Sequence, residues 1–229
     1  MTRSIATLLI ATLAALGSAA PAPAANEPRA ALEEALSHDG LQKIKIKGID
    51  LAYARPGASL AGYNKIIIDP IEVSFRKDWD PKRAGSRAKL STQERENIRS
   101  GVARIVEEEF TKTLEKGAPY KVVKDAGADV LRLQIGITDL YVNAPDTMSP
   151  GRTRTYTLSA GEMTLVGELI DSESGQVISR FIDRREARNT GTMQLTNSVV
   201  NAQEARTIAA AWARILRNRL DAAHAAKGP

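Results

Sequence analysis

Asp69 and Glu72 are the two acidic residues in this sequence whose spacing comes nearest to a catalytic pair. Paired carboxylates act as general acid and general base in hydrolases that work without histidine. The two residues flank Pro70 in a strand-like segment, and strict alternation points them to opposite faces unless Pro70 shifts the register. A carboxylate-based hydrolase centred on Asp69 and Glu72 is thus one alternative, and a turn or capping role for Asp69 is the favoured one.

Other catalytic groups are sparse. The only two histidines are His38, in an N-terminal approach segment, and His224, near the end of the last helix-like stretch. No cysteine is present, and the sequence contains neither a Gly-x-Ser-x-Gly elbow nor a phosphate-binding glycine loop. The acidic run around Asp171 and Glu173 lacks the ligand spacing of a calcium loop. We therefore expect no catalytic residues, no metal site and no cofactor, and predict that the protein is not an enzyme.

A charged segment with a tryptophan at its centre is the better candidate for binding. Tryptophan and arginine are enriched where protein interfaces gain most of their energy. The candidate partner-binding residues are Arg76, Lys77, Trp79, Lys82 and Arg83. They predict contact with an envelope protein or an anionic envelope polymer. The alternative is that Trp79 folds back onto the core while the charged residues only solvate a loop.

Residues 1–24 have the anatomy of a secretory signal peptide. One charge, Arg3, precedes an apolar run from Ile5 to Leu16 that is too short to span a bilayer, and a small-residue tail ends at Ala24. Its removal leaves 31 basic against 27 acidic residues, a net charge of +4 that does not indicate nucleic-acid binding. A periplasmic or secreted protein with no transmembrane span after cleavage is expected, and without cysteine it cannot carry a lipid on that residue.

Strand patterns dominate the rest of the chain. Residues 25–40 suggest a flexible lead-in, and residues 41–226 a single domain organised around the strand from Tyr63 to Phe75. Further strands are expected at 43–53, 120–124, 128–142, 162–170 and 176–187, the last two joined by a hairpin with Gly175 in its turn.

Two long amphipathic helices complete the pattern. Ser91 and Glu94 form a capping-box pattern before apolar residues at helical spacing, and Lys116 and Gly117 mark the end of that helix. A second helix is expected over residues 201–226. The fold class is therefore α+β, with an antiparallel or mixed sheet of about five to six strands and two long helices packed on one face.

The leading functional hypothesis is an exported, non-enzymatic envelope or periplasmic module that acts through protein or polymer contacts. Besides the hydrolase centred on Asp69 and Glu72, a structural role in oligomer formation through an exposed strand edge stays open. The sequence leaves the partner and the oligomeric state undetermined.

Several short segments resemble one bacterial family. They are Tyr53–Ala58, Tyr63–Ile71, Ala128–Leu133 and Glu168–Ser172 with Gly175. Together they look like the secreted and lipoprotein chains known as domain of unknown function 3313, over roughly residues 40–220. Many members of that family resemble lipoproteins, whereas this chain has no cysteine. The resemblance implies a compartment and a fold and assigns no activity.

Overall fold

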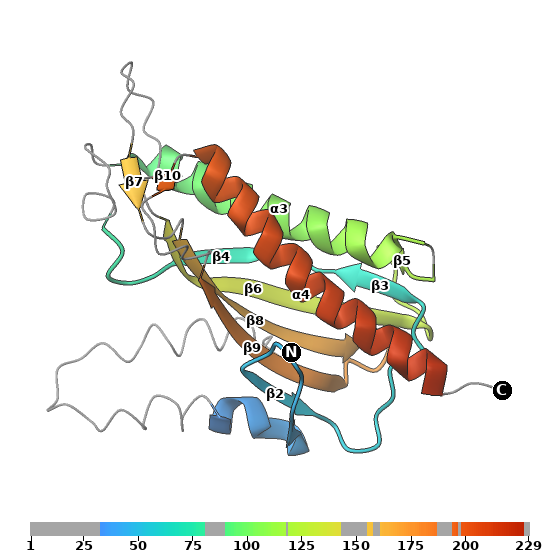
Figure 1. Ribbon diagram of the computed structural model, residues 1–229. Coiled ribbons are helices and arrows are strands. Elements are labelled where there is room, and N and C mark those ends of the chain that lie inside the picture. The colour runs from blue at the N-terminus through green and yellow to red at the C-terminus, as the bar shows by residue number, and fades with distance from the viewer. Residues whose placement is uncertain are drawn as a thin grey trace, which may run out of the picture.

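The computed structural model describes residues 33–80, 90–117, 119–142, 155–157, 161–186, 194–196 and 198–226. One mixed sheet of eight strands carries two long helices on one face (Figure 1). This arrangement confirms the expected α+β class, with a sheet larger than the five to six strands predicted. The predicted signal peptide, residues 1–24, lies outside the described residues.

The main sheet runs in the order β1-β2-β9-β8-β6-β3-β5, and β4 also pairs with β6. Its strands are β1 (Gln42–Ile44), β2 (Leu51–Ala54), β3 (Lys65–Ile68), β4 (Glu72–Phe75), β5 (Lys121–Val122), β6 (Val130–Val142), β8 (Gly161–Asp171) and β9 (Val177–Glu186). A separate two-stranded sheet joins β7 (Thr155–Thr157) to β10 (Gln194–Thr196). The β8–β9 hairpin turns at Gly175, whose φ of 69° suits glycine.

The segment from Tyr63 to Phe75 does not organise the sheet, because it is two short strands separated at Asp69 and Pro70. β3 and β4 both pair in parallel with β6, which pairs antiparallel with β8 on its other side. Pro70 has no N–H to donate to a ladder, which is consistent with the break at this point. The central element is therefore β6, which corresponds to the strand expected at 128–142 and is buried along most of its length.

The helices α3 (Thr92–Glu115) and α4 (Ser198–Ala226) pack against each other across the sheet (Figure 1). The predicted capping box of α3 is confirmed: Ser91 Oγ accepts from the Glu94 amide at 3.2 Å, and the Ser91 amide donates to Glu94 at 2.7 Å. At the other end of α3, Arg217 of α4 donates to the carbonyls of Thr113, Leu114 and Lys116. These bonds join the two helices where α3 would otherwise leave carbonyls unpaired.

The main core lies between the helices and the sheet. Alternate residues of β6, Leu131, Leu133 and Ile137, are fully buried in one cluster with Phe110 of α3 and Trp212 of α4. Their period of two places them on one face of the strand. Burial of this face holds the two helices on the sheet.

The opposite face of β8 and β9 is covered by the N-terminal segment. Residues 33–37 are helical and continue into a short helix, η1 (His38–Gly40). Leu36 is fully buried against Val166 and Ile182. Of the expected lead-in, residues 33–40 are thus packed onto the sheet, while residues 25–32 lie outside the described part. Within the described residues, no helix has the length and apolar character needed to cross a membrane.

Candidate functional site

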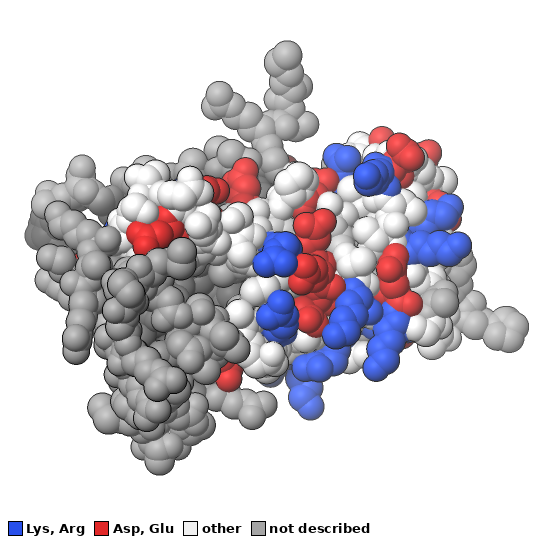
Figure 2. Space-filling model, turned by 90° about the horizontal axis from the view of Figure 1, so that it is seen from above, with Lys and Arg blue, Asp and Glu red and all other residues white. Residues whose placement is uncertain are grey.

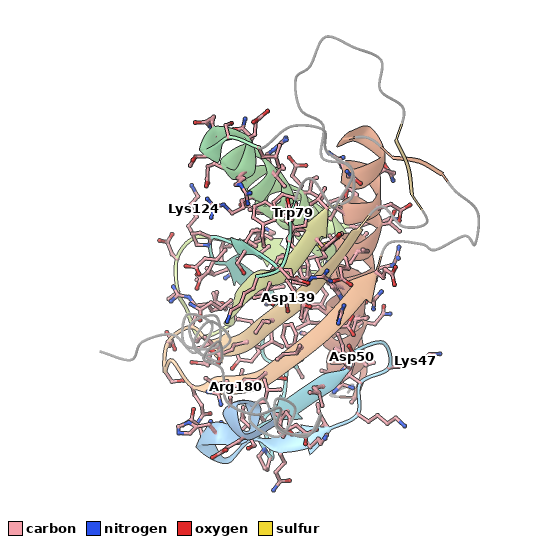
Figure 3. The ribbon with its side chains drawn as sticks, turned by 90° about the vertical axis from the view of Figure 1, so that its left-hand side faces the viewer. Lys47, Asp50, Trp79, Lys124, Asp139 and Arg180 are labelled. Carbon is pink, nitrogen blue, oxygen red and sulfur yellow. The ribbon has the colours of Figure 1, made fainter. Side chains whose placement is uncertain are left out.

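Trp79, the centre of the predicted binding segment, is buried. It is 6% exposed, and its Nε1 donates to the Val142 carbonyl at 3.0 Å. Its ring stacks on Phe75 with centroids 4.1 Å apart, and the Arg95 guanidinium lies 5.2 Å from the ring centroid. Figure 3 shows Trp79 close to α3. The indole is therefore a core group, which corrects the expectation that it is a surface anchor.

The neighbouring charges divide into two groups. Arg76 bonds to Asp78 and Glu162, and its guanidinium lies 4.2 Å from the centre of the Tyr141 ring. Lys77 is exposed, whereas Lys82 and Arg83 lie outside the described residues. The structure gives Arg76 an internal role and does not test partner binding by Lys77, Lys82 or Arg83.

The two candidate carboxylates have different surroundings. Asp69 accepts a hydrogen bond from Gln134 at 3.1 Å, and its other oxygen lies 3.5 Å from Arg132 Nε. Glu72 is exposed at the start of β4, where the register pairs it with Gly136. Asp69 is thus tied to β6, as a structural role predicts, and the hydrolase alternative stays an untested prediction.

Neither histidine forms part of an evident catalytic group. His38 is exposed and pairs with Asp39, while His224 lies in edge contact with the Tyr120 ring. Among the described residues, no three histidine, cysteine or acidic side chains are grouped so that they could hold a metal ion.

Among the described residues, the feature with the character of a ligand site is an apolar pocket between α4 and the end of the sheet formed by β1, β2 and β9. It encloses about 110 Å³ of open space. Its lining is mostly aliphatic and aromatic, with one serine and two arginines: Ile44, Ile46, Ile49, Ala54, Arg55, Ala58, Leu60, Phe110, Leu165, Leu169, Ile178, Ser179, Phe181, Trp212, Ile215, Leu216 and Arg219. An engineered apolar cavity of ~150 Å³ stays dry and binds small apolar molecules, so this pocket has the character of a binding site.

The wall that α4 contributes is held in place by a buried carboxylate. Asp183, 3% exposed, accepts at 2.7 Å from Trp212 Nε1 and at 2.7 Å from Arg185 Nε. It also accepts from the Asp50 amide. These bonds fix the position of the indole ring that lines the pocket.

The loop after β1 closes one side of the pocket. Gly48 has φ 84°, and a side-chain carbon there would lie 3.1 Å from Ile215 Cδ1. Glycine thus permits both the left-handed backbone and the close approach of this loop to α4. Two neighbouring isoleucines of the same loop, Ile46 and Ile49, are thereby brought into the lining.

A second depression lies between β4 and the first half of α3. It is more open, and its lining includes Glu96, Arg99, Arg104 and Glu107. Arg99 pairs with Glu96 at 2.5 Å, and Arg104 with Glu108 at 3.5 Å. Both arginines of the groove are thus paired with acidic side chains of the same helix. The exposed Glu72 of β4 also lies in its lining.

Sequence reasoning did not find the pocket. Its lining comes from segments separated by up to 175 residues, from Ile44 to Arg219, and local periodicity does not report such distant neighbours. One signal was present in the alternation of Ile44 and Ile46 with Lys43, Lys45 and Lys47, within the strand expected at 43–53. The structure shows that the apolar side of this alternation lines the pocket.

A family model described as a protein of unknown function, DUF3313, matches residues 33–216. No curated protein matches the chain. Among solved structures, the PelC dodecamer of Paraburkholderia phytofirmans is similar at 13% identity and TM-score 0.39, covering 72% of this chain and 94% of that chain. The DUF330-family protein XCC0632 of Xanthomonas campestris is similar at 11% identity and TM-score 0.38, covering 74% of this chain and 93% of that chain.

Proposed function

The chain belongs to the DUF3313 family, and we propose that it is an exported, non-enzymatic module of the cell envelope that binds an apolar ligand in the pocket beneath α4. The observation that carries the proposal is the pocket itself, which has an almost wholly apolar lining and lies beside a rigidly held Trp212. Apolar pockets with a few polar groups are the usual form of a small-molecule site.

Export and lack of catalysis are supported by different features. The signal-peptide pattern of residues 1–24 supports a periplasmic or secreted location. The engagement of Asp69 by Gln134 and Arg132 supports a structural role for that carboxylate. The polar groups of the pocket are a serine and two arginines, a set that matches no nucleophile–base pair.

A neutral fluorescent probe tests the pocket. N-phenyl-1-naphthylamine, whose emission rises in apolar surroundings, should bind the purified mature chain saturably with a stoichiometry near one. Ala58→Trp should weaken this binding at least tenfold, because Ala58 is exposed and lines the pocket, so a large ring there covers its entrance. Ala222→Trp, at an exposed position of α4 outside the lining, is the matched control.

Two results would contradict the proposal: the absence of saturable binding by the wild-type chain, or equal binding by the Ala58→Trp and wild-type proteins. Thermal melts of both variants, followed by circular dichroism, identify any loss of binding that comes from unfolding.

A further inference from the structure

Two guanidinium groups stand at the apolar pocket without a carboxylate partner among the described residues. Arg55 Nε donates to the Val177 carbonyl at 2.8 Å, which anchors the side chain and leaves its two terminal nitrogens for other acceptors. Arg219 is exposed on α4 one turn after Leu216, so both project from the same side of the helix into the lining.

Several arginines of the described part of the molecule are paired with acidic side chains: Arg76, Arg180, Arg184, Arg185 and Arg217 each have one. Arg55 and Arg219 belong to a second group without such a pair among the described residues, which also contains Arg95, Arg206 and Arg214 outside the lining. Because Arg55 and Arg219 are the members of this group that line the pocket, their charge is available to a ligand bound there.

The surroundings of the pocket add positive charge. Lys45 and Lys47 are exposed beside the lining residues Ile44 and Ile46, whereas Lys43 pairs with Glu33 at 2.9 Å. Figure 3 shows Lys47 extending away from the body of the protein. Looking down on the helix layer, Figure 2 shows Lys and Arg side chains interspersed with Asp and Glu side chains, so that face as a whole is of mixed charge. The positive charge near the pocket is local, and it raises the local concentration of anions there.

From this combination we infer that the ligand is a fatty-acid-type molecule: a single alkyl chain that ends in a carboxylate. The alkyl chain occupies the apolar lining, and the carboxylate lies against Arg55 and Arg219, whose planar forks suit bidentate hydrogen bonding. A space of about 110 Å³ accommodates part of one alkyl chain rather than the two chains of a phospholipid. This inference rests on the proposed function, since it requires the same pocket.

Ligands with one chain and different head groups separate the contributions of the pocket and of the charge. Decanoate, decanol and decyltrimethylammonium, each below its micellar concentration, compete with bound N-phenyl-1-naphthylamine. In the wild-type chain, decanoate should bind at least tenfold more tightly than decanol, and decyltrimethylammonium most weakly. Added salt should weaken the binding of decanoate and leave the binding of decanol nearly unchanged.

Variants that change the charge of the two arginines test where the carboxylate of the ligand lies. Arg219→Gln should lower the affinity for decanoate about tenfold and change the affinity for decanol by no more than about twofold. Only the charged head group of decanoate loses a partner in this variant. Arg214→Gln makes the same change in net charge at an exposed position of α4 outside the lining, so it should retain most decanoate affinity. Arg55→Lys keeps the charge but loses the fixed fork, and should weaken decanoate less than Arg55→Gln does.

Equal affinity for decanoate and decanol would overturn the fatty-acid inference and leave the proposed apolar site intact. Equal losses in Arg219→Gln and Arg214→Gln would also overturn it, since they would show only a long-range effect of net charge. Binding to phosphatidylglycerol vesicles without competition by decanoate would assign the charge to a membrane surface and overturn it too. If neither the fluorescent probe nor any of the competitors bound, both the proposed function and the fatty-acid inference would be overturned.

Discussion

Arg180 and Glu168 form an ion pair that is almost completely withdrawn from solvent. The Arg180 Nε lies 2.7 Å from Glu168 Oε1, and the two side chains are 0% and 3% exposed. The remaining donors of Arg180 bond to the His38 carbonyl and to Asp39 at 2.7 Å each. In Figure 3, Arg180 lies between β9 and the N-terminal segment. The pair thus joins the sheet to the segment that covers its second face.

Removing one member of this pair should be costly. Arg180→Met leaves the Glu168 carboxylate buried without its partner, and we expect the free energy of unfolding to fall by about 3–5 kcal/mol. The double variant Arg180→Met, Glu168→Leu replaces both charges by apolar groups and should recover much of that loss. Urea denaturation gives the free energy of unfolding of the wild type, of Arg180→Met and of the double variant.

Arg184 on the same strand supplies the control. Its side chain is 61% exposed and pairs with Glu162. Arg184→Met should therefore lower the free energy of unfolding by no more than about 1 kcal/mol. A double variant no more stable than Arg180→Met alone would show that the cost of that substitution does not come from leaving Glu168 without its partner.

Trp79 should behave as a core residue in spite of its charged neighbours. Trp79→Ala removes a buried ring, its stack on Phe75 and its bond to the Val142 carbonyl, and should lower the free energy of unfolding by about 3–5 kcal/mol. Lys77→Ala, two residues away and exposed, should change it by less than about 0.5 kcal/mol. Chemical denaturation distinguishes these values. A stable Trp79→Ala protein would return the indole to the surface as a possible contact for a partner.

The sequence predicted well the elements whose signals are local. Ser91 and Glu94 lie three residues apart and bond to each other's backbone, so the start of α3 could be predicted without tertiary information. Gly175 is a similar case in the β8–β9 turn. The pattern of two helices on one side of a sheet followed from periodicity, which reports how each element is buried.

Strand order and burial within loops could not be predicted in this way. β6 takes β3 and β4 in parallel on one side, and no local pattern in Tyr63–Phe75 specifies that partner. Trp79 is flanked by charges along the chain but is buried by Phe75 and the carbonyl of Val142, which lies 63 residues away. The pocket depends in the same way on distant residues, so the candidate site emerged only from the fold.

Asp171 should make stability depend on pH in the acidic range. The amide and hydroxyl of Ser174, each at 2.7 Å, and the Tyr63 hydroxyl at 2.8 Å hold the pKa of the Asp171 carboxyl below its usual value of 3.8. Between the lowered pKa and 3.8 the unfolded chain binds more protons, so the contribution is present above 3.8 and is lost as the pH falls through the lowered pKa.

Asp171→Asn should therefore lose less stability than the wild-type chain when the pH is lowered from about 6 to about 3. Glu173→Gln, an exposed neighbour in the same turn, should follow the wild type. Urea midpoints at a series of pH values provide the comparison. Identical acid dependence in the wild type and in Asp171→Asn would show that these hydrogen bonds do not set the pKa.

Gly167 and Phe181 connect the stability of the sheet to the space in the pocket. A side-chain carbon on Gly167 would lie 2.6 Å from the Phe181 ring and 2.7 Å from Ile135, so this position of β8 has no room for a methyl group. Gly167→Ala should lower the free energy of unfolding by about 1–3 kcal/mol through overpacking. Because Phe181 lines the pocket, displacement of its ring should also weaken binding of N-phenyl-1-naphthylamine. Adding Phe181→Leu should relieve the overpacking and restore part of the stability.

The control is Gly62→Ala, at a position where nothing lies within 4 Å of the added carbon. Its free energy of unfolding should be within about 0.5 kcal/mol of the wild-type value. If Gly167→Ala matched Gly62→Ala in both stability and probe binding, the close contact between Gly167 and Phe181 would not constrain the pocket.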